Sequence, residues 1–194
     1  MKVSKKGEYA LRALIDLGIA AEVGRSLLQV TELAASERIP VKFLEQIMQL
    51  LKEAGMVESR RGKFGGYRLA RPAGSITIGQ IVRLIVGPLA PIGCVSQTAY
   101  EKCSCPDETH CGLRMVMLDV RNAIANIVDR YSLADVVEVT LRKMRRDGVA
   151  LPFSQTERRP AEEPERRVVM RIGSPARLHA VEGLIDNLPG DYAI

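Results

Sequence analysis

The sequence predicts a mainly α-helical protein that begins with a winged helix-turn-helix, which carries a small β-hairpin wing, and that has a long helix further along. Three observations carry this prediction. Apolar residues recur at helical spacing in the first third of the chain. A short helix and a tight turn come before the most amphipathic segment, and two strand-like segments then flank a glycine-rich turn.

The first two helices are predicted from apolar spacing and capping residues. Residues 6–21 carry apolar side chains at helical spacing: Ala10, Leu11, Leu14, Ile15 and Leu17. A turn around Gly24 follows, and residues 29–37 (QVTELAASE) then form a short helix. Thr31 is its expected N-cap, because a threonine hydroxyl can accept a hydrogen bond from a free backbone N–H of the first turn.

The third helix and the hairpin complete the predicted winged unit. Residues 41–54 place apolar side chains at i, i+3, i+4 and i+7: Leu44, Ile47, Met48 and Leu51. Gly55 stands where a C-terminal glycine is typical. Strands over residues 56–59 and 67–69 lie on either side of RRGKFGG, and this order predicts a hairpin with a glycine-rich turn.

Further helices are expected on both sides of a cysteine-rich loop. Thr77 is the expected N-cap of a helix that Pro88 ends. After the loop, a long helix to about Tyr131 carries one apolar stripe: Leu113, Val116, Met117, Val120, Ile124, Ile127 and Val128. Ser132 in SLAD begins a capping box and a helix to about Met144. The stripe fits burial against a partner chain or against the protein's own core.

We therefore expect three parts. Residues 1–88 form the winged helix-turn-helix, and residues 89–144 contain the cysteine loop and the helices that follow it. Residues 145–194 are charged and contain proline, which predicts a linker or disordered segment. Within that segment, residues 167–172 predict a strand and Ser174 begins a predicted short helix.

The positive charge is concentrated in the predicted winged unit. The chain has a net charge of +5, and residues 1–72 hold 13 Lys/Arg against 8 Asp/Glu, whereas the rest is balanced. A basic unit favours a polyanionic partner, with double-stranded DNA the first candidate. In such units the second helix of the pair enters the major groove. Its outward-facing candidates for base and phosphate contact are Lys42, Glu45, Gln46 and Gln49.

The hairpin tip adds a second set of candidate DNA contacts. Arg60, Arg61 and Lys63 lie beside glycines that let the backbone approach a duplex closely. Such cations can neutralise phosphates or enter a narrow minor groove. The alternative is that the polar side chains of the helix and hairpin form an ordinary solvated surface.

All four cysteines of the chain lie within residues 94–111, as Cys94, Cys103, Cys105 and Cys111. Three kinds of site fit these thiols. They can hold an iron–sulfur cluster, bind a structural zinc ion or act as a metal-free thiol switch. The spacing lacks the C-x2-C pairs typical of zinc ribbons, and the single residue between Cys103 and Cys105 strains simultaneous ligation of one ion.

Several segments together resemble one protein family. They are MKVSKKGEYALRALIDLG, IPVKFLEQIMQLLKEAGMVESRRGKFGGYRLARP, the cysteine loop and SLADVVE. Over residues 1 to about 143 the chain resembles the Rrf2 family of winged-helix bacterial transcription regulators, which includes IscR, NsrR and RirA. The resemblance implies a homodimer that pairs through the helix after the cysteine loop and binds a palindromic operator. It also implies base contacts by Glu45 and Gln46 and a minor-groove contact by Arg61.

The resemblance further implies an iron–sulfur cluster, of the 2Fe–2S or 4Fe–4S type, on three cysteines. Cys94 and Cys111 match the first and third positions, and Cys105 has the family's five-residue spacing to Cys111. Cys103 is an extra cysteine that can replace Cys105 or complete an all-cysteine set.

The family pattern excludes one residue as the fourth ligand and leaves two further candidates. One branch of the family has a histidine where this chain has Arg114, which cannot ligate because a guanidinium stays protonated. In another branch a carboxylate of the partner subunit serves, and Glu8 stands at that position. His110 is a local alternative.

Other function classes are disfavoured. The sequence has no dinucleotide-binding glycine fingerprint, no HExxH and no nucleophile elbow, which argues against an enzyme. It has no run of 18 apolar residues, so no transmembrane helix is expected. The first residues lack a signal-peptide pattern, and we therefore expect a cytoplasmic protein.

Overall fold

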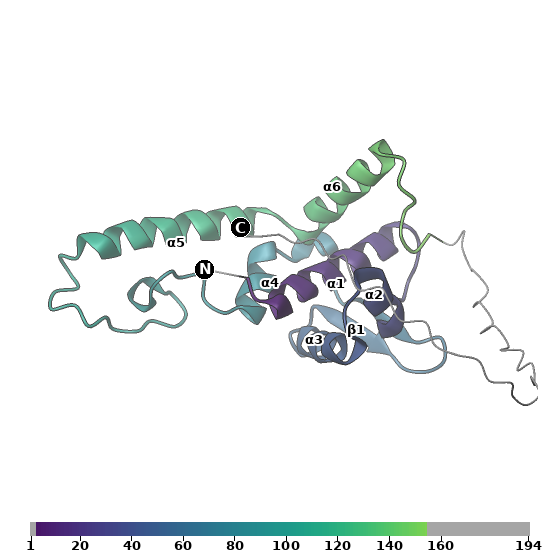
Figure 1. The fold of residues 1–194 in the computed structure, drawn as a ribbon, viewed down its shortest axis with the longest axis horizontal. Helices are drawn as coiled ribbons and strands as arrows, with labels where there is room; N and C mark the ends of the chain where they lie inside the picture. Colours follow the sequence, from purple (N-terminus) through teal and green to yellow (C-terminus); the bar gives the residue numbers. More distant parts are fainter. Residues whose placement is uncertain (1–2, 155–194) are drawn as a thin grey trace, which may run out of the picture. The chain divides into compact units, whose positions relative to one another are not determined.

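The computed structural model describes residues 3–154, and Figure 1 shows the order of their elements. The helices and strands are α1 (Lys5–Glu22), α2 (Val30–Glu37), α3 (Val41–Glu53), β1 (Val57–Arg60), β2 (Gly66–Leu69), η1 (Ala73–Ser75), α4 (Ile78–Ile85), η2 (Gly93–Val95), α5 (Gly112–Arg130) and α6 (Leu133–Arg146). The predicted fold class is confirmed: helices dominate, and one two-stranded antiparallel hairpin follows α3. The strand and helix predicted after residue 166 lie outside the described residues.

Helix α1 is the centre of the winged unit, and it contacts α2, α3, α4, α6 and β2. Its inward face combines small and branched residues that are almost fully buried: Ala10, Ala13, Leu14, Leu17, Ile19 and Ala20. The small residues let neighbouring helices approach closely. A Cβ atom on Gly18 would lie 2.6 Å from a methyl group of Val137 in α6. Because protein interiors are close-packed, this short approach ties the position of α6 to that of α1.

The helix-turn-helix has the predicted order but a different cap. Helix α2 starts after Gln29, so the prediction that Thr31 is its N-cap was wrong. The reason is tertiary: Leu28 and Tyr67 exchange two backbone hydrogen bonds of 3.0 and 2.8 Å, which hold the chain extended up to Gln29. The turn to α3 then passes through Arg38, whose φ of 52° lies in the left-handed region.

Helix α3 buries the predicted apolar stripe completely, with Leu44, Ile47, Met48 and Leu51 at 0% exposure. The wing follows, with Val57 opposite Leu69 and Arg60 opposite Gly66. Two glycines make it possible: a Cβ on Gly65 would lie 2.1 Å from the Arg60 carbonyl oxygen, and one on Gly66 would lie 2.5 Å from the Leu28 carbonyl oxygen. The wing is thus closed against itself and docked on the segment before α2.

The predicted caps on either side of the cysteine loop are present: Thr77 caps α4, in a capping box with Gln80, and Ser132 forms the predicted capping box of α6 with Asp135. The two caps are adjacent in space, because Ile78 N donates to Tyr131 O at 2.9 Å and Leu133 N donates to Ile76 O at 2.8 Å. A two-pronged ion pair joins Arg83 of α4 to Asp129 of α5, with both distances 2.6 Å. These bonds fix the C-terminal end of α5 to the winged unit.

Asp16 of α1 is the charged side chain that is buried among the described residues, with 4% exposure, and its Oδ2 atom has no hydrogen-bond partner there. Burial is the main cause that raises the pKa of Asp16, to about 7, and the nearby Glu37 carboxylate acts in the same direction. A hydrogen bond from Ser36 opposes the shift. An aspartate in the unfolded chain loses its proton near pH 4, so the folded state binds the proton more tightly.

The free energy of unfolding should therefore fall as the pH rises from about 4 to about 7 and level off above that range. We expect Asp16→Asn to remove most of this dependence and to raise stability at about pH 8 by about 1–3 kcal/mol, because an amide needs no proton to stay neutral. Urea denaturation at about pH 5 and about pH 8 measures both effects. Glu22→Gln, on the exposed end of α1, is the control, and equal pH dependence in both variants would contradict the assignment.

Candidate functional site

The outward face of α3 carries the four predicted contact residues. Lys42, Gln46 and Gln49 are exposed, and Glu45 is half-buried. Lys42 Nζ lies 3.3 Å from a carboxylate oxygen of Glu45, and Gln49 donates to Glu53 at 2.7 Å. The face therefore presents amide, carboxylate and ammonium groups together on a helix whose opposite side is anchored in the core. Such a mixture of donors and acceptors suits the edges of bases in a major groove.

The wing tip carries the three predicted cations. Arg60, Arg61 and Lys63 are all exposed. The ion pair of the wing joins Glu58 to Arg68, further along the strands. The tip is held to the helix-turn-helix: Gln29, the residue before α2, donates from its side-chain amide to the carbonyl of Lys63 at 3.1 Å. The positive charge of the tip thus sits on a fixed loop.

The sequence interpretation missed Phe64, which lies between these cations and the glycine pair. Its side chain is 85% exposed, the largest exposure among the large apolar residues described. The ammonium group of Lys63 lies 5.8 Å from the centroid of its ring. The signal was present in RRGKFGG, since an aromatic residue inside a short glycine-rich turn has no core to enter.

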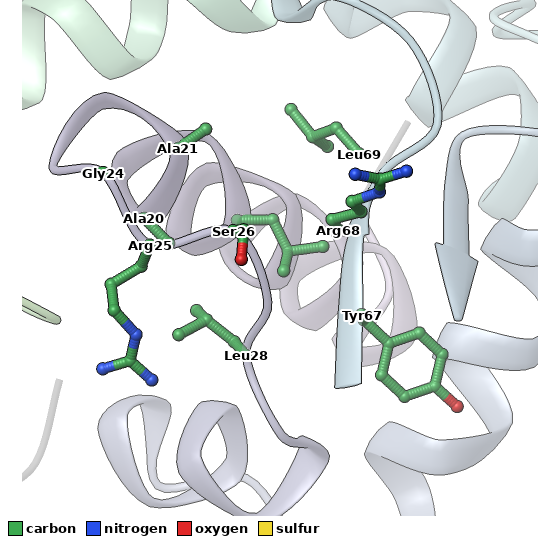
Figure 2. A pocket seen from close by; sticks show the side chains of 10 residues that line it. Ala20, Ala21, Gly24, Arg25, Ser26, Leu28, Tyr67, Arg68 and Leu69 are labelled. Atoms are coloured by element: carbon green, nitrogen blue, oxygen red, sulfur yellow. The ribbon is translucent and has the colours of Figure 1, made fainter. Parts of the chain in front are cut away.

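A pocket of about 330 Å³ lies between the end of α1, the loop after it and β2. Figure 2 shows Arg25 and Arg68 on opposite sides of it, and Leu28 also lines it. Both arginines are already ion-paired, Arg25 with Glu32 at 3.0 Å and Arg68 with Glu58. With its cations engaged, the pocket offers no free charged group to a ligand, and we assign none.

The cysteine loop brings its thiols together in pairs. Cys94 in η2 is buried, Cys103 and Cys111 are half-buried, and Cys105 is exposed. Cys103 interacts with both Cys94 and Cys105, and Cys105 also interacts with Cys111. Burial raises the pKa of Cys94, and hydrogen bonding with Cys103 raises the pKa of Cys105 to about 11. These two thiols are therefore protonated at neutral pH when no metal is bound.

The donor chemistry of the loop fits a thiolate-bound metal or cluster, since the loop carries all four thiols of the chain. In residues 3–154, however, no three potential ligands are grouped closely enough to hold a metal ion. Cys111 also has a structural role, because its sulfur accepts a hydrogen bond of 3.4 Å from the backbone N–H of Arg114 and caps α5. Cys111 therefore belongs both to the cysteine loop and to the cap that begins α5.

Glu108 is the carboxylate that the structure brings to the thiols, and the sequence interpretation had not considered it. It accepts from the Tyr100 hydroxyl at 2.8 Å and from the Cys103 sulfur at 3.7 Å. Arg114 Nε lies 3.2 Å from the other carboxylate oxygen of Glu108. The side chain of Glu108 is only 22% exposed. The signal for it was its position midway between two cysteines in CPDETHC.

The two predicted non-cysteine ligands have other partners in the described chain. Glu8 pairs with Lys5 at 2.8 Å and with Arg12 at 3.5 Å. His110 is exposed, with its Nδ1 atom 2.6 Å from Asp107. Neither is brought to a thiol of its own chain.

The apolar stripe of α5 is uncovered. None of the residues of α5 is buried within the part of the chain that the structure describes. Leu113, Val116, Val120 and Ile127 of the stripe are exposed, and its other three residues are half-buried. The stripe is therefore not part of the described core, which was one of the two alternatives. No helix among the described residues is both long and apolar enough to cross a membrane.

Known proteins with a similar sequence or fold are transcriptional regulators. The model of the Rrf2 family, described as an iron-dependent transcriptional regulator, matches residues 3–139. An Rrf2-like HTH-type transcriptional regulator of Rhodobacter capsulatus is 37% identical over 139 residues, which cover 70% of this chain and 91% of that protein. Among solved structures, CymR, the global cysteine regulator of B. subtilis, is 28% identical with a TM-score of 0.60, covering 72% of this chain and 98% of that chain.

The structure of T. potens IscR is 27% identical with a TM-score of 0.57, covering 77% of this chain and 93% of that chain. The relatives are transcriptional regulators, and the expectation that this chain is not an enzyme agrees with them. The basic winged unit, the wing and the cysteine loop are thus those of a DNA-binding regulator, and the chain belongs to the Rrf2 family of transcriptional regulators.

Proposed function

We propose that the protein is a homodimer that binds a palindromic operator in double-stranded DNA and responds to iron, nitric oxide or redox state through an iron–sulfur cluster. In this proposal residues 1–88 bind DNA, and residues 89–144 sense and dimerise. Since its partner is chromosomal DNA, the protein works in the cytoplasm. The observation that carries the proposal is a thiol-rich loop whose last cysteine, Cys111, caps helix α5.

Sequence readout is assigned to α3 and the wing. Glu45 and Gln46 read base edges, and Lys42 and Gln49 lie on the same outward face. Arg61 enters the minor groove, while Arg60 and Lys63 neutralise phosphates. The proposal is supported by the anchoring of both elements, because α3 is packed into the core and the wing is bonded to the segment before α2. A rigid support lowers the entropy that ordering would cost on binding.

Dimerisation is assigned to α5. Its stripe leaves four large apolar side chains exposed on one face, and such apolar surface often marks an interaction site. Two chains that pair through this helix about a two-fold axis would present their two recognition helices to half-sites spaced by whole turns of DNA.

The cluster is assigned to Cys94, Cys111 and one of the pair Cys103 and Cys105. Of the non-cysteine candidates for a fourth ligand, Glu108 is supported by its contact with Cys103. Glu8 of a partner chain and His110 are the alternatives, and Cys103 can complete an all-cysteine set. When bound, the cluster supplies a group that iron limitation, oxygen or nitric oxide can alter.

The coupling runs through residues of this chain. Cys111 caps the N-terminal end of α5, and Arg83 holds its C-terminal end through Asp129. A change in the arrangement of the loop therefore acts on a helix that is fixed to α4 and that carries the dimer stripe. To regulate DNA binding, one arrangement must favour the spacing of the recognition helices that fits the operator.

A second candidate is a regulator without a cluster, in which the loop binds structural zinc or works as a thiol switch. It is supported by the similarity to CymR, which is described as a global cysteine regulator. The raised pKa values of Cys94 and Cys105 argue against a thiolate that is reactive at neutral pH. Metal content separates these candidates.

Anaerobic purification should give a brown protein that contains iron and sulfide. A colourless protein that contains zinc would refute the iron–sulfur sensor and leave DNA binding intact.

We expect Glu108→Gln to shift the visible absorption and lower the iron content, because an amide is a poorer ligand than a carboxylate. Asp107→Asn is the matched control, since it changes the neighbouring carboxylate, which faces His110 instead. Loss of iron in Glu8→Gln with none in Glu108→Gln would instead favour the partner-chain ligand.

Base readout can be tested with duplexes selected by the wild-type protein from a random library. Glu45→Ala should alter the preferred base at one position in each half-site by about 1–3 kcal/mol, because a base-edge contact is lost. Lys63→Ala should weaken binding to all duplexes and lower the slope of log affinity against log salt by about 1. Uniform effects of both substitutions on all sequences would contradict the assignment of α3 as the reading helix.

The dimer surface can be tested by placing a charge on the α5 stripe. Val120→Asp should weaken dimerisation by about 100-fold or more, because a carboxylate would be buried without a partner. Asn122→Asp adds the same charge away from the stripe and should leave the dimer intact. Sedimentation velocity of both variants measures the effect, and equal dimer content would exclude this face.

A further inference from the structure

The wing tip presents an apolar ring at its most exposed point. Phe64 lies between Lys63 and Gly65, and 85% of its side chain is exposed. Leaving a phenyl ring in water forgoes about 25 cal/mol for each Å² that could be buried, so the exposure has a cost that a partner would remove. The ring is not part of the core and contributes no packing to it.

The tip that carries the ring is fixed from three sides. Gly65 N donates to Gly62 O at 2.9 Å and closes the turn, and Gln29 holds the carbonyl of Lys63. Behind the tip, Tyr67 and Leu28 exchange their two backbone hydrogen bonds. A ring on such a support enters a groove without a large loss of backbone entropy.

The surroundings of the ring indicate the kind of partner. Arg60, Arg61 and Lys63 are exposed cations in the same short segment, and the carboxylate of the wing, Glu58, is already engaged by Arg68. An exposed apolar ring on a cationic wing tip fits a polyanion that also offers apolar surface. The minor groove of DNA has both, with phosphates along its edges and deoxyribose and base edges on its walls and floor. Proteins that use this groove often insert a phenylalanine or leucine between base steps.

We propose that Phe64 is a DNA-contacting wedge of the wing, which enters the minor groove beside Arg61 and inserts its ring between two adjacent base pairs. This inference rests on the proposed binding of DNA by the wing and adds an apolar contact to its charged ones. Lys63, which lies 5.8 Å from the ring centroid, is close enough to reach a phosphate next to the inserted ring. The contact favours pyrimidine–purine steps, which unstack most easily, and so contributes sequence preference that α3 does not read.

The test compares Phe64→Ala, Phe64→Leu and Lys63→Ala on a duplex selected by the wild-type protein, by fluorescence anisotropy at several salt concentrations. Phe64→Ala should lower affinity about 5- to 20-fold with an unchanged salt slope, because the lost contact is apolar. Phe64→Leu should recover most of the affinity, since leucine also serves as a wedge. A 2-aminopurine placed at the step under the wing should brighten with the wild type and with Phe64→Leu but not with Phe64→Ala.

The outcomes separate this inference from the proposed function. If the wild-type protein selects no duplex, DNA binding by this chain fails and the wedge with it. If it selects one and Phe64→Ala binds within about two-fold of wild type, or lowers the salt slope as Lys63→Ala does, the wedge is overturned and DNA binding stands. Thermal melting of each variant should be unchanged, because the ring does not contribute to the core.

Discussion

The burial of α1 is the interaction on which the other elements depend. Five elements pack on this one helix, and its small inward residues set how closely they approach. The contact between Gly18 and Val137 brings in α6, and through the paired caps of α4 and α6 the same core fixes the start of α4. A larger side chain at the centre would therefore displace several helices at once, because a close-packed core cannot yield at one point alone.

Helix α5 is held at each of its two ends by a specific interaction. The ion pair between Arg83 and Asp129 fixes one end of α5, and the sulfur of Cys111 caps the other. Between them, α5 has no buried residue in the described chain, so its stability depends on its caps, its internal hydrogen bonds and whatever covers its stripe. Such an element is suited to a change of arrangement, since few contacts within the chain oppose it.

The wing shows how a local sequence requirement serves a long-range purpose. Gly65 and Gly66 are required because any Cβ there would clash with a carbonyl oxygen, one in the wing itself and one in the segment before α2. That docking also decides where α2 starts, which explains why Thr31 is not the cap. Charge and shape are then combined at the tip, where an apolar ring stands among cations that the rest of the wing leaves unengaged.

The sequence by itself determined the helices, the hairpin and the caps at Thr77 and Ser132, because periodicity and capping are local and a few neighbouring residues suffice to specify them. It also determined the polar face of α3. Only the tertiary structure decided which groups lie against the thiols. His110 is nearer in sequence to Cys111 but turns toward Asp107, whereas Glu108 is held inward by Tyr100 and Arg114. The tertiary structure likewise decided that the α5 stripe is uncovered, since periodicity shows that a face is apolar but not what buries it.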